Sequence, residues 1–135
     1  ESWNAETHPP TSIDSIVANA EKYSDTIVIT GGEPLTWDMG PLTQGLKGKG
    51  MTIHIETSGA YPLTGVWDWI CLSPKKNKLP VGDIYKKAQE LKVIVYNTTL
   101  FLLRNKPLRW GRIAFFIYNP NGVYATKWFH KLWIM

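Results

Sequence analysis

The stretch Thr26-Ile-Val-Ile-Thr-Gly-Gly-Glu-Pro34 decides the fold of this chain. Its β-branched start predicts a buried strand over residues 26–29. Gly31 and Gly32 then allow positive φ angles and let a ligand approach the backbone closely. Glu33 adds a carboxylate, and the proline after it stiffens the turn. Because ligand sites in α/β folds lie at the carboxyl ends of parallel strands, this end is the first candidate site, suited to a ligand with an ammonium group.

Strands and helices alternate on both sides of this stretch. The segment Thr11-Ser12-Ile13-Asp14 resembles a helix N-cap with an acid in the first turn, and Gly48-Lys49-Gly50 is typical of a helix stop. The order of elements is typical of a parallel sheet with crossover helices, so we expect an α/β fold. The predicted helices cover residues 11–24, 41–49 and 83–91, and the predicted strands cover residues 26–29, 51–57, 69–72 and 92–96.

Length and cysteine content narrow the class of protein. The chain has 135 residues, which is enough for about one domain. It contains no apolar run long enough to span a membrane and no secretory leader pattern. Its single cysteine, Cys71, excludes an internal disulfide and a metal cluster held by several thiolates of this chain. These features predict a cytoplasmic protein that does not interact with membranes.

Charge is distributed unevenly along the chain. All 11 acidic residues lie in residues 1–97, whereas residues 98–135 contain six lysine and arginine residues and no acid. A soluble domain normally mixes both signs of charge, so the composition changes sharply near residue 98. The basic, tryptophan-containing segment leaves one alternative open, a non-catalytic nucleotide-binding or RNA-binding module. We nevertheless expect no nucleic-acid partner, because the motifs described below account for more of the sequence.

Polar motifs follow three of the predicted strands. They are Thr30-Gly-Gly-Glu-Pro34, Glu56-Thr-Ser-Gly59 and Ser73-Pro-Lys-Lys76. Each motif alone has an ordinary explanation as a turn, a helix cap or a solvated basic loop. In a parallel sheet, however, the three ends lie side by side and offer carboxylates, hydroxyls, glycine backbone and a lysine around one rim. By contrast, we interpret His54 as a half-buried structural residue and Cys71 as a buried apolar filler.

These motifs carry a resemblance to a known family. The segment Ile29-Thr-Gly-Gly-Glu-Pro34 resembles the S-adenosylmethionine-binding motif of radical SAM enzymes. Residues 1–97 as a whole resemble the 7-carboxy-7-deazaguanine synthase family. This resemblance rests on that motif together with residues 56–59, residues 68–76 and the opening Glu1-Ser-Trp-Asn4. The Gly-Gly-Glu-Pro motif alone is shared with radical-enzyme activases, so another radical SAM enzyme stays an alternative, but the segment 68–76 is more specific.

The resemblance implies a reaction, cofactors and partners. The family is a group of radical SAM lyases of queuosine biosynthesis that convert 6-carboxy-5,6,7,8-tetrahydropterin to 7-carboxy-7-deazaguanine with loss of ammonia. The implied cofactors are S-adenosyl-L-methionine, a [4Fe-4S] cluster and Mg²⁺. The implied partners are the small-molecule pterin substrate, a reductant such as flavodoxin and a second copy of the chain in a homodimer.

The resemblance also implies roles for individual residues. Thr30 is expected to contact the pterin substrate, and Glu33 to accept a hydrogen bond from the ammonium group of S-adenosylmethionine. A carboxylate for an ammonium group and a lysine for carboxylate or ribose oxygens are chemically suitable partners. No catalytic residue and no metal ligand is assigned within this chain. The residues expected to bind S-adenosylmethionine are Gly31, Gly32, Glu33, Ser58, Ser73, Pro74 and Lys75.

The sequence departs from the family at its start. Family members place a Cys-x-x-x-Cys-x-x-Cys motif a few residues before the position of Glu1, and three thiolates hold the cluster. Cys71 cannot replace them, and the family's magnesium ligand and first strand also precede Glu1. The resemblance therefore predicts a fragment, inactive as given, whose fold is a partial radical SAM (β/α) barrel with parallel strands, truncated at the N-terminus and aberrant at the C-terminus.

The sequence departs from the family again after Asn97. The family continues with an acid-rich helix, a strand and a Gln-Pro-Glu-Trp motif, none of which is present. Back-translation of residues 102–110, read two bases on, gives Ala-Glu-Glu-Gln-Ala-Ala-Lys-Val, which suits the missing helix. Residues 98–135 are therefore interpreted as translated out of frame or as a genuine divergent basic tail, and residues 1–97 as a partial radical SAM core.

Overall fold

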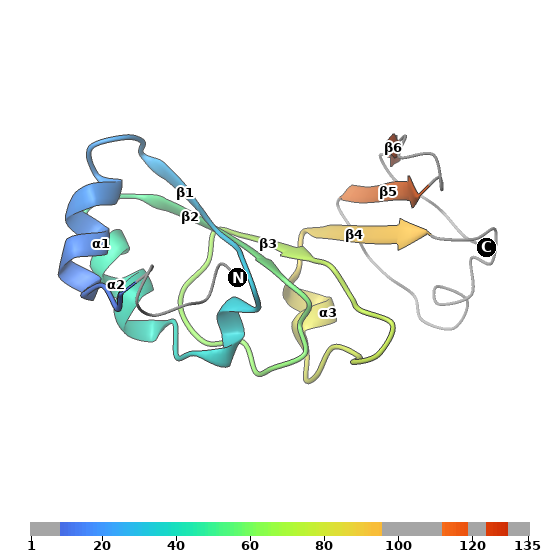
Figure 1. The fold of residues 1–135 in the computed structure, drawn as a ribbon, viewed down its shortest axis with the longest axis horizontal. Helices are drawn as coiled ribbons and strands as arrows, with labels where there is room; N and C mark the ends of the chain where they lie inside the picture. Colours follow the sequence, from blue (N-terminus) through green and yellow to red (C-terminus); the bar gives the residue numbers. More distant parts are fainter. Residues whose placement is uncertain (1–8, 96–111, 119–123, 130–135) are drawn as a thin grey trace.

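The computed structural model describes residues 9–95, 112–118 and 124–129. Their strands form one sheet in the order of the sequence (Figure 1). Within this part of the chain, no helix has the length and apolar character needed to cross a bilayer. The elements are α1 (Ile13–Ala20), β1 (Thr26–Ile29), the 3₁₀ helix η1 (Pro34–Thr36), α2 (Gly40–Gly48), β2 (Thr52–Thr57), β3 (Trp69–Leu72), α3 (Ile84–Lys87), β4 (Glu90–Val95), β5 (Arg112–Tyr118) and β6 (Tyr124–Phe129).

The sheet confirms the predicted α/β class. Neighbouring strands from β1 to β5 pair in parallel, and β6 pairs antiparallel to β5. The four strands expected in residues 1–97 are all present, and two further strands come from the basic segment. Whether that segment is out of frame or genuinely divergent stays a prediction. The opening residues 1–4, the last residue of the fourth predicted strand and residues 98–111 lie outside the described residues.

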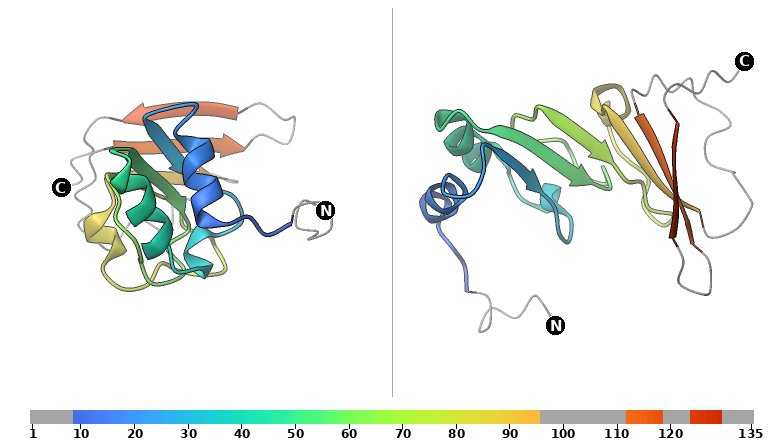
Figure 2. Two further views of the ribbon diagram at one scale, coloured as in Figure 1. Left: turned by 90° about the vertical axis from the view of Figure 1, so that its left-hand side faces the viewer. Right: turned by 90° about the horizontal axis from the view of Figure 1, so that it is seen from above.

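All three α-helices pack against one face of the sheet (Figure 2). On this face Ile53 packs in one cluster with residues of α1 and α2, and Ile55 packs in a second cluster with Ile84 of α3. Side chains alternate between the two faces of a strand, so Glu56 belongs to the opposite face. Its register partner Cys71 faces the same way. No helix among the described residues packs on that opposite face, which leaves it available for polar groups.

The start of α1 matches the prediction. Ser12 is the N-cap, and its hydroxyl oxygen accepts a hydrogen bond from the backbone N–H of Ser15 at 3.2 Å. The helix ends at Ala20, before the predicted end near residue 24, and turns follow. Ile13, Ile16, Val17 and Ala20 form an apolar stripe along α1. Val17 is buried against α2 and the sheet, whereas Ile13 stays partly exposed. The stripe therefore contacts the core along only part of its width.

The boundary between α3 and β4 differs from the prediction. The helix ends at residue 87 instead of residue 91, and the strand begins at residue 90 instead of residue 92. Ala88 is already extended, with φ −71° and ψ 139°. Gln89 exchanges two hydrogen bonds with Ile70: its N–H donates to the Ile70 carbonyl at 3.1 Å, and its Oε1 accepts from the Ile70 N–H at 2.7 Å. Pairing with β3 therefore overrides the helical preference of these residues.

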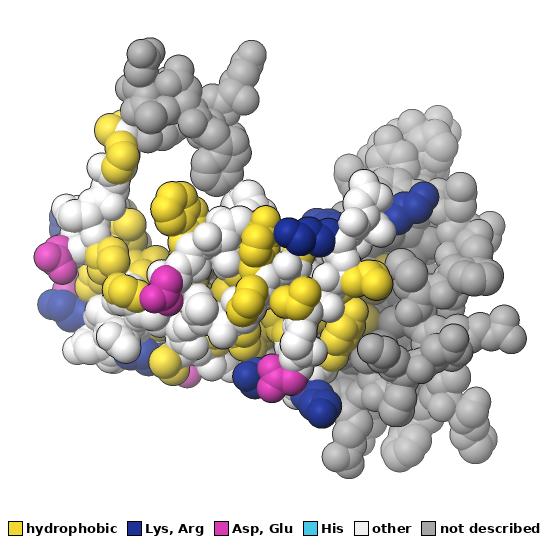
Figure 3. Space-filling view, turned by 90° about the horizontal axis from the view of Figure 1, so that it is seen from below, with side chains coloured by type: hydrophobic (Ala, Val, Ile, Leu, Met, Phe, Trp, Pro, Cys, Tyr) yellow, Lys and Arg dark blue, Asp and Glu magenta, His cyan; other side chains and the backbone are white. Residues whose placement is uncertain are grey.

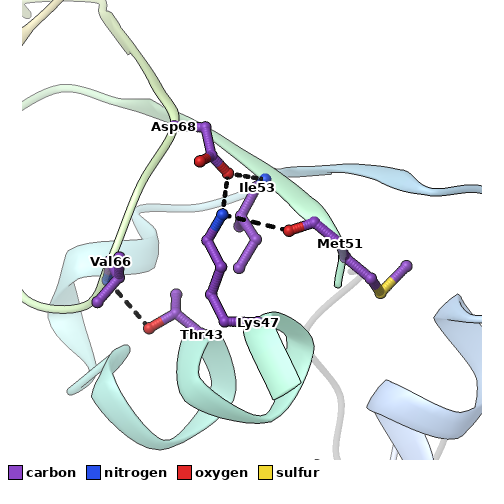
Figure 4. A network of polar contacts seen from close by, with 6 residues as sticks. All are labelled: Thr43, Lys47, Met51, Ile53, Val66 and Asp68. Carbon is purple, nitrogen blue, oxygen red and sulfur yellow. Dashed lines mark hydrogen bonds and ion pairs between the residues drawn. The ribbon is translucent and has the colours of Figure 1, made fainter. Parts of the chain in front are cut away.

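Side chains of α2 fix the loop that leads into β3 (Figure 4). Thr43 is fully buried, and its hydroxyl oxygen accepts from the backbone N–H of Val66 at 3.1 Å. One turn later, Lys47 forms an ion pair with Asp68. The Oδ2 atom of Asp68 also accepts from the backbone N–H of buried Ile53 at 2.6 Å. The first residues of β2 and the residue before β3 are thus held to the same helix.

We expect the variant Asp68→Ala to destabilise the protein and Asp68→Asn to do so less. The alanine variant leaves the Ile53 N–H without its acceptor and Lys47 without its counter-ion, at a cost of about 1–2 kcal/mol, reduced where water reaches the partly exposed site. Asparagine keeps an acceptor for the N–H. Urea denaturation followed by circular dichroism measures both free energies of unfolding. Equal losses in the two variants would show that the N–H acceptor contributes nothing.

Candidate functional site

The three polar strand ends surround one hollow at the carboxyl edge of β1, β2 and β3. Its volume is about 300 Å³. Six of the eight predicted binding residues line it, whereas Gly31 and Pro74 do not. The expectation that the three motifs lie side by side is therefore confirmed by geometry. The lining residues are Thr30, Gly32, Glu33, Glu56, Thr57, Ser58, Ser73, Lys75 and Lys92.

Glu33 occupies the centre of a hydrogen-bonded arrangement. The two glycines before it have φ angles of 92° and 36°, which turn the chain away from β1. The Oε1 atom of Glu33 accepts from the Leu35 N–H at 3.2 Å, as an N-cap of η1, and from the Thr57 hydroxyl at 2.5 Å. Its Oε2 atom accepts from the Ser58 N–H at 2.8 Å and from the Ser58 hydroxyl. One side chain thus joins the end of β1 to the end of β2.

These hydrogen bonds decide the charge state of Glu33. Burial raises the pKa of its carboxyl group, but the hydrogen bonds from Ser58, Thr57 and Leu35 lower it by more. The net pKa lies below the ordinary value of a glutamate, so Glu33 is ionised at neutral pH. The hollow therefore contains a fixed negative charge that is already surrounded by donors.

The turn after β2 is fixed by its own contacts. The Thr57 hydroxyl oxygen accepts from the Gly59 N–H at 2.9 Å, and the Ser58 hydroxyl oxygen accepts from the Ala60 N–H at 3.3 Å. Gly59 has φ 71°, and its carbonyl accepts from the Val81 N–H at 2.8 Å. The segment therefore enters the hollow in one defined conformation, which Gly59 permits because it lacks a Cβ atom.

The third strand end supplies a hydroxyl and a lysine. The Ser73 N–H donates to the Thr57 carbonyl at 2.7 Å, which extends the pairing of β2 and β3 by one residue. The Ser73 side chain is buried, and its hydroxyl oxygen accepts from Lys75 Nζ at 3.2 Å. Lys75 is exposed on the rim, so its ammonium group is available to an anionic or hydroxylated ligand.

Two further charged residues, Glu56 and Lys92, line the hollow without being predicted as binding residues. Lys92 Nζ donates to both carboxylate oxygens of Glu56, at 3.2 Å and 3.1 Å, and so bridges from β4 to β2 across β3. A signal was present in the sequence, because Lys92 is the one charged residue of the otherwise apolar strand predicted at residues 92–96. A charge there indicates a side chain on the polar face of the sheet.

His54 and Cys71 have the structural roles expected of them. The rings of His54 and Trp69 lie 6.2 Å apart on neighbouring strands. Cys71 is buried, and burial together with the nearby charges of Glu90 and Glu56 raises the pKa of its thiol to about 12. The thiolate form that binds iron is therefore strongly disfavoured. In the part of the chain that the structure describes, no group of three or more potential metal ligands occurs.

The hollow combines both signs of charge with neutral donors and acceptors. Glu33 and Glu56 supply negative charge, Lys75 and Lys92 supply positive charge, and the hollow is also lined by four hydroxyl side chains and the backbone of Gly32. This set suits a zwitterionic ligand with further hydroxyl groups. A larger hollow beside α1, of about 630 Å³, has Lys22 as its one charged lining residue. The strand-end hollow is therefore the better candidate although it is smaller.

Comparisons with known proteins identify relatives of this chain. No protein-family model matches the chain. Over 102 residues, the chain is 68% identical to the 7-carboxy-7-deazaguanine synthase of Flavobacterium psychrophilum, covering 76% of this chain and 49% of that protein. It is 51% identical over 96 residues to the enzyme of the same name from Synechocystis sp., covering 70% of this chain and 46% of that protein. The chain thus spans about half the length of the curated relatives it matches.

A solved structure resembles the fold. The crystal structure of QueE from Escherichia coli superposes with a TM-score of 0.62 and 28% sequence identity, covering 78% of this chain and 52% of that chain. The architecture described above is therefore shared with part of that protein. The names of these relatives support the synthase family and not the radical-enzyme activases that share the Gly-Gly-Glu-Pro motif.

Proposed function

We propose that this chain, a homologue of the 7-carboxy-7-deazaguanine synthases, provides one wall of the S-adenosylmethionine site of such an enzyme. The observation that carries the proposal is the convergence of three motif-bearing strand ends on one hollow with charges of both signs. The methionine part of S-adenosylmethionine carries an ammonium group and a carboxylate, and its ribose carries hydroxyls. The hollow offers a complementary group for each.

In this proposal, residues in the hollow and beside it contact different parts of the ligand. The Gly31-Gly32 backbone lets the methionine part approach the end of β1 closely. Ser73 and Lys75 take the carboxylate and ribose oxygens, because a hydroxyl and an ammonium group both donate to such acceptors. Pro74 shapes the loop between them. Thr30, the first residue after β1, is proposed to contact the pterin substrate.

The whole reaction belongs to the proposal as well. The family enzyme converts 6-carboxy-5,6,7,8-tetrahydropterin to 7-carboxy-7-deazaguanine with loss of ammonia, as a cytoplasmic homodimer supplied with electrons by a reductant such as flavodoxin. A [4Fe-4S] cluster would supply the reducing electron to S-adenosylmethionine, and Mg²⁺ would assist at the substrate. The thiol content of this chain does not fit such a cluster, since Cys71 is its one cysteine and is buried. No step is assigned to the cluster on this chain.

The RNA-binding alternative depends on the basic segment 98–135, whose side chains lie outside the described residues. In the part of this face that Figure 3 draws in colour, lysine side chains are interspersed with acidic and apolar ones and form no continuous basic patch. Binding to a nucleic-acid backbone is normally driven by such a patch. The synthase proposal accounts for the strand-end motifs, which the RNA-binding alternative leaves unexplained.

A matched pair of lysine variants tests the proposed site. S-Adenosylhomocysteine keeps the amino-acid and ribose groups and needs no cluster, so its binding can be measured by isothermal titration calorimetry. We expect Lys75→Ala to weaken binding roughly tenfold, because one charge-assisted hydrogen bond contributes about 1.5–3 kcal/mol. Lys76→Ala should bind like the wild type, because Lys76 does not line the hollow. Equal effects of the two variants would argue against the assignment.

A further inference from the structure

The carboxylate of Glu33 is already surrounded by donors from its own chain. An ionised carboxylate offers about four lone-pair positions. Four donors point at them: the Leu35 N–H and the Thr57 hydroxyl at Oε1, and the Ser58 N–H and hydroxyl at Oε2. A ligand ammonium group that bonded directly to Glu33 would have to share or displace one of these donors. Glu33, which the motif predicts as the acceptor for the ligand's ammonium group, therefore already has its acceptor positions occupied by hydrogen bonds within the protein.

The hydroxyl of Ser58 is the group that Glu33 leaves facing the hollow. A serine hydroxyl has one proton to donate and two lone pairs to accept with. The proton of Ser58 goes to Glu33, and one lone pair accepts from the Ala60 N–H. The second lone pair is left for a ligand, since Ser58 is one of the residues that line the hollow. With its proton on a carboxylate, this oxygen is a polarised acceptor and suits a ligand ammonium or hydroxyl group.

We propose that Glu33 is a positioning residue that acts on the ligand through Ser58, holding the turn after β2 against the end of β1 and orienting the Ser58 oxygen as the acceptor for the ligand's ammonium group. This inference rests on the proposed S-adenosylmethionine site and assigns one of its contacts. The second carboxylate of the hollow is not an equivalent acceptor, because both oxygens of Glu56 accept from Lys92.

A double-mutant cycle separates this role from direct contact. The full chain and its variants Glu33→Gln, Ser58→Ala and the double variant are titrated with S-adenosylhomocysteine. A glutamine offers one carbonyl oxygen to four donors, so it cannot hold the turn as a carboxylate does. We expect each single variant to weaken binding roughly tenfold. The double variant should bind no more than about twofold more weakly than Glu33→Gln alone, because the effects of substituting two residues that act as one unit are not additive. A loss of roughly a hundredfold in the double variant, the product of the singles, would overturn the proposal.

Two further measurements test the roles of Ser58 and Glu33 separately. Ser58→Thr keeps the hydroxyl and should restore most of the binding lost in Ser58→Ala, and failure of Ser58→Ala to weaken binding would overturn the acceptor role. In ligand-free protein, hydrogen exchange of the Ser58 N–H should accelerate at least about tenfold in Glu33→Gln, while exchange of the Ile53 N–H, bonded to Asp68, stays unchanged. Unchanged exchange at Ser58 would overturn the positioning role.

The two proposals fail in distinguishable ways. If the wild type does not bind S-adenosylhomocysteine, the proposed function and the ligand contact of Ser58 are both overturned. Accelerated exchange at Ser58 in Glu33→Gln would still support the positioning of the turn by Glu33. If the wild type binds and the cycle is additive, the proposed function stands and the indirect role of Glu33 is overturned.

Discussion

Replacing Gly59 by alanine is expected to destabilise the protein by about 3 kcal/mol, the largest effect of any single substitution considered for this fold. Gly59 has φ +71°, which L side chains rarely adopt. A Cβ atom there would lie 2.6 Å from Leu72 Cδ1, 3.0 Å from Pro80 Cβ and 3.2 Å from Ile84 Cγ2. The alanine must therefore displace core side chains as well as strain the backbone. Urea unfolding followed by tryptophan fluorescence measures the loss.

Gly82→Ala is the matched control for the backbone contribution. Gly82 has a similar φ of +63°, but a Cβ atom there meets nothing within 4 Å. We expect a cost of about 1–2 kcal/mol, the strain of the left-handed conformation alone. The difference between the two variants isolates the packing of the Glu56–Gly59 turn on the core. If both variants lose the same stability, the turn does not pack as described.

Reconstitution of this chain with iron and sulfide, followed by addition of S-adenosylmethionine and a reductant such as dithionite, is expected to yield no cluster and no 5′-deoxyadenosine. Radical SAM cleavage needs a cluster held by several thiolates, and this chain has one cysteine, with a thiol pKa of about 12. Anaerobic absorption spectra and chromatography of the products measure both outcomes. The full-length relative from Flavobacterium psychrophilum, treated identically, is the positive control. Cluster absorbance or 5′-deoxyadenosine from this chain would contradict the prediction.

Local patterns predicted the first three strands well, because each is a short β-branched or apolar run ended by a glycine or proline motif. The strand at 69–72 was predicted with its observed bounds. The meeting of the three strand ends followed from parallel topology alone, since the carboxyl ends of parallel strands share one edge. That single topological inference was enough to bring Thr30, Ser58 and Ser73 into one hollow.

The remaining features depend on contacts between residues far apart in the sequence. The early start of β4 depends on Gln89 pairing with Ile70, which competes with a helical preference that local patterns overestimate. The ion pair between Glu56 and Lys92 crosses an intervening strand, so only the register of three strands reveals it. The four donors around Glu33 could not be predicted from the sequence either. The motif indicates a carboxylate that is free to bind a ligand, and only the fold shows which groups donate to it.

Binding of S-adenosylhomocysteine, mapped residue by residue, tests the central claim that the strand ends form one wall of an S-adenosylmethionine site. The ligand is titrated into the full ¹⁵N-labelled chain and followed by two-dimensional NMR. We expect the largest amide shift changes at Gly31, Gly32, Ser58 and Ser73. If these amide signals did not shift at millimolar ligand, or if the largest changes lay in the hollow beside α1, at residues such as Thr11, Ser15 and Asn19, the strand ends would not form such a site.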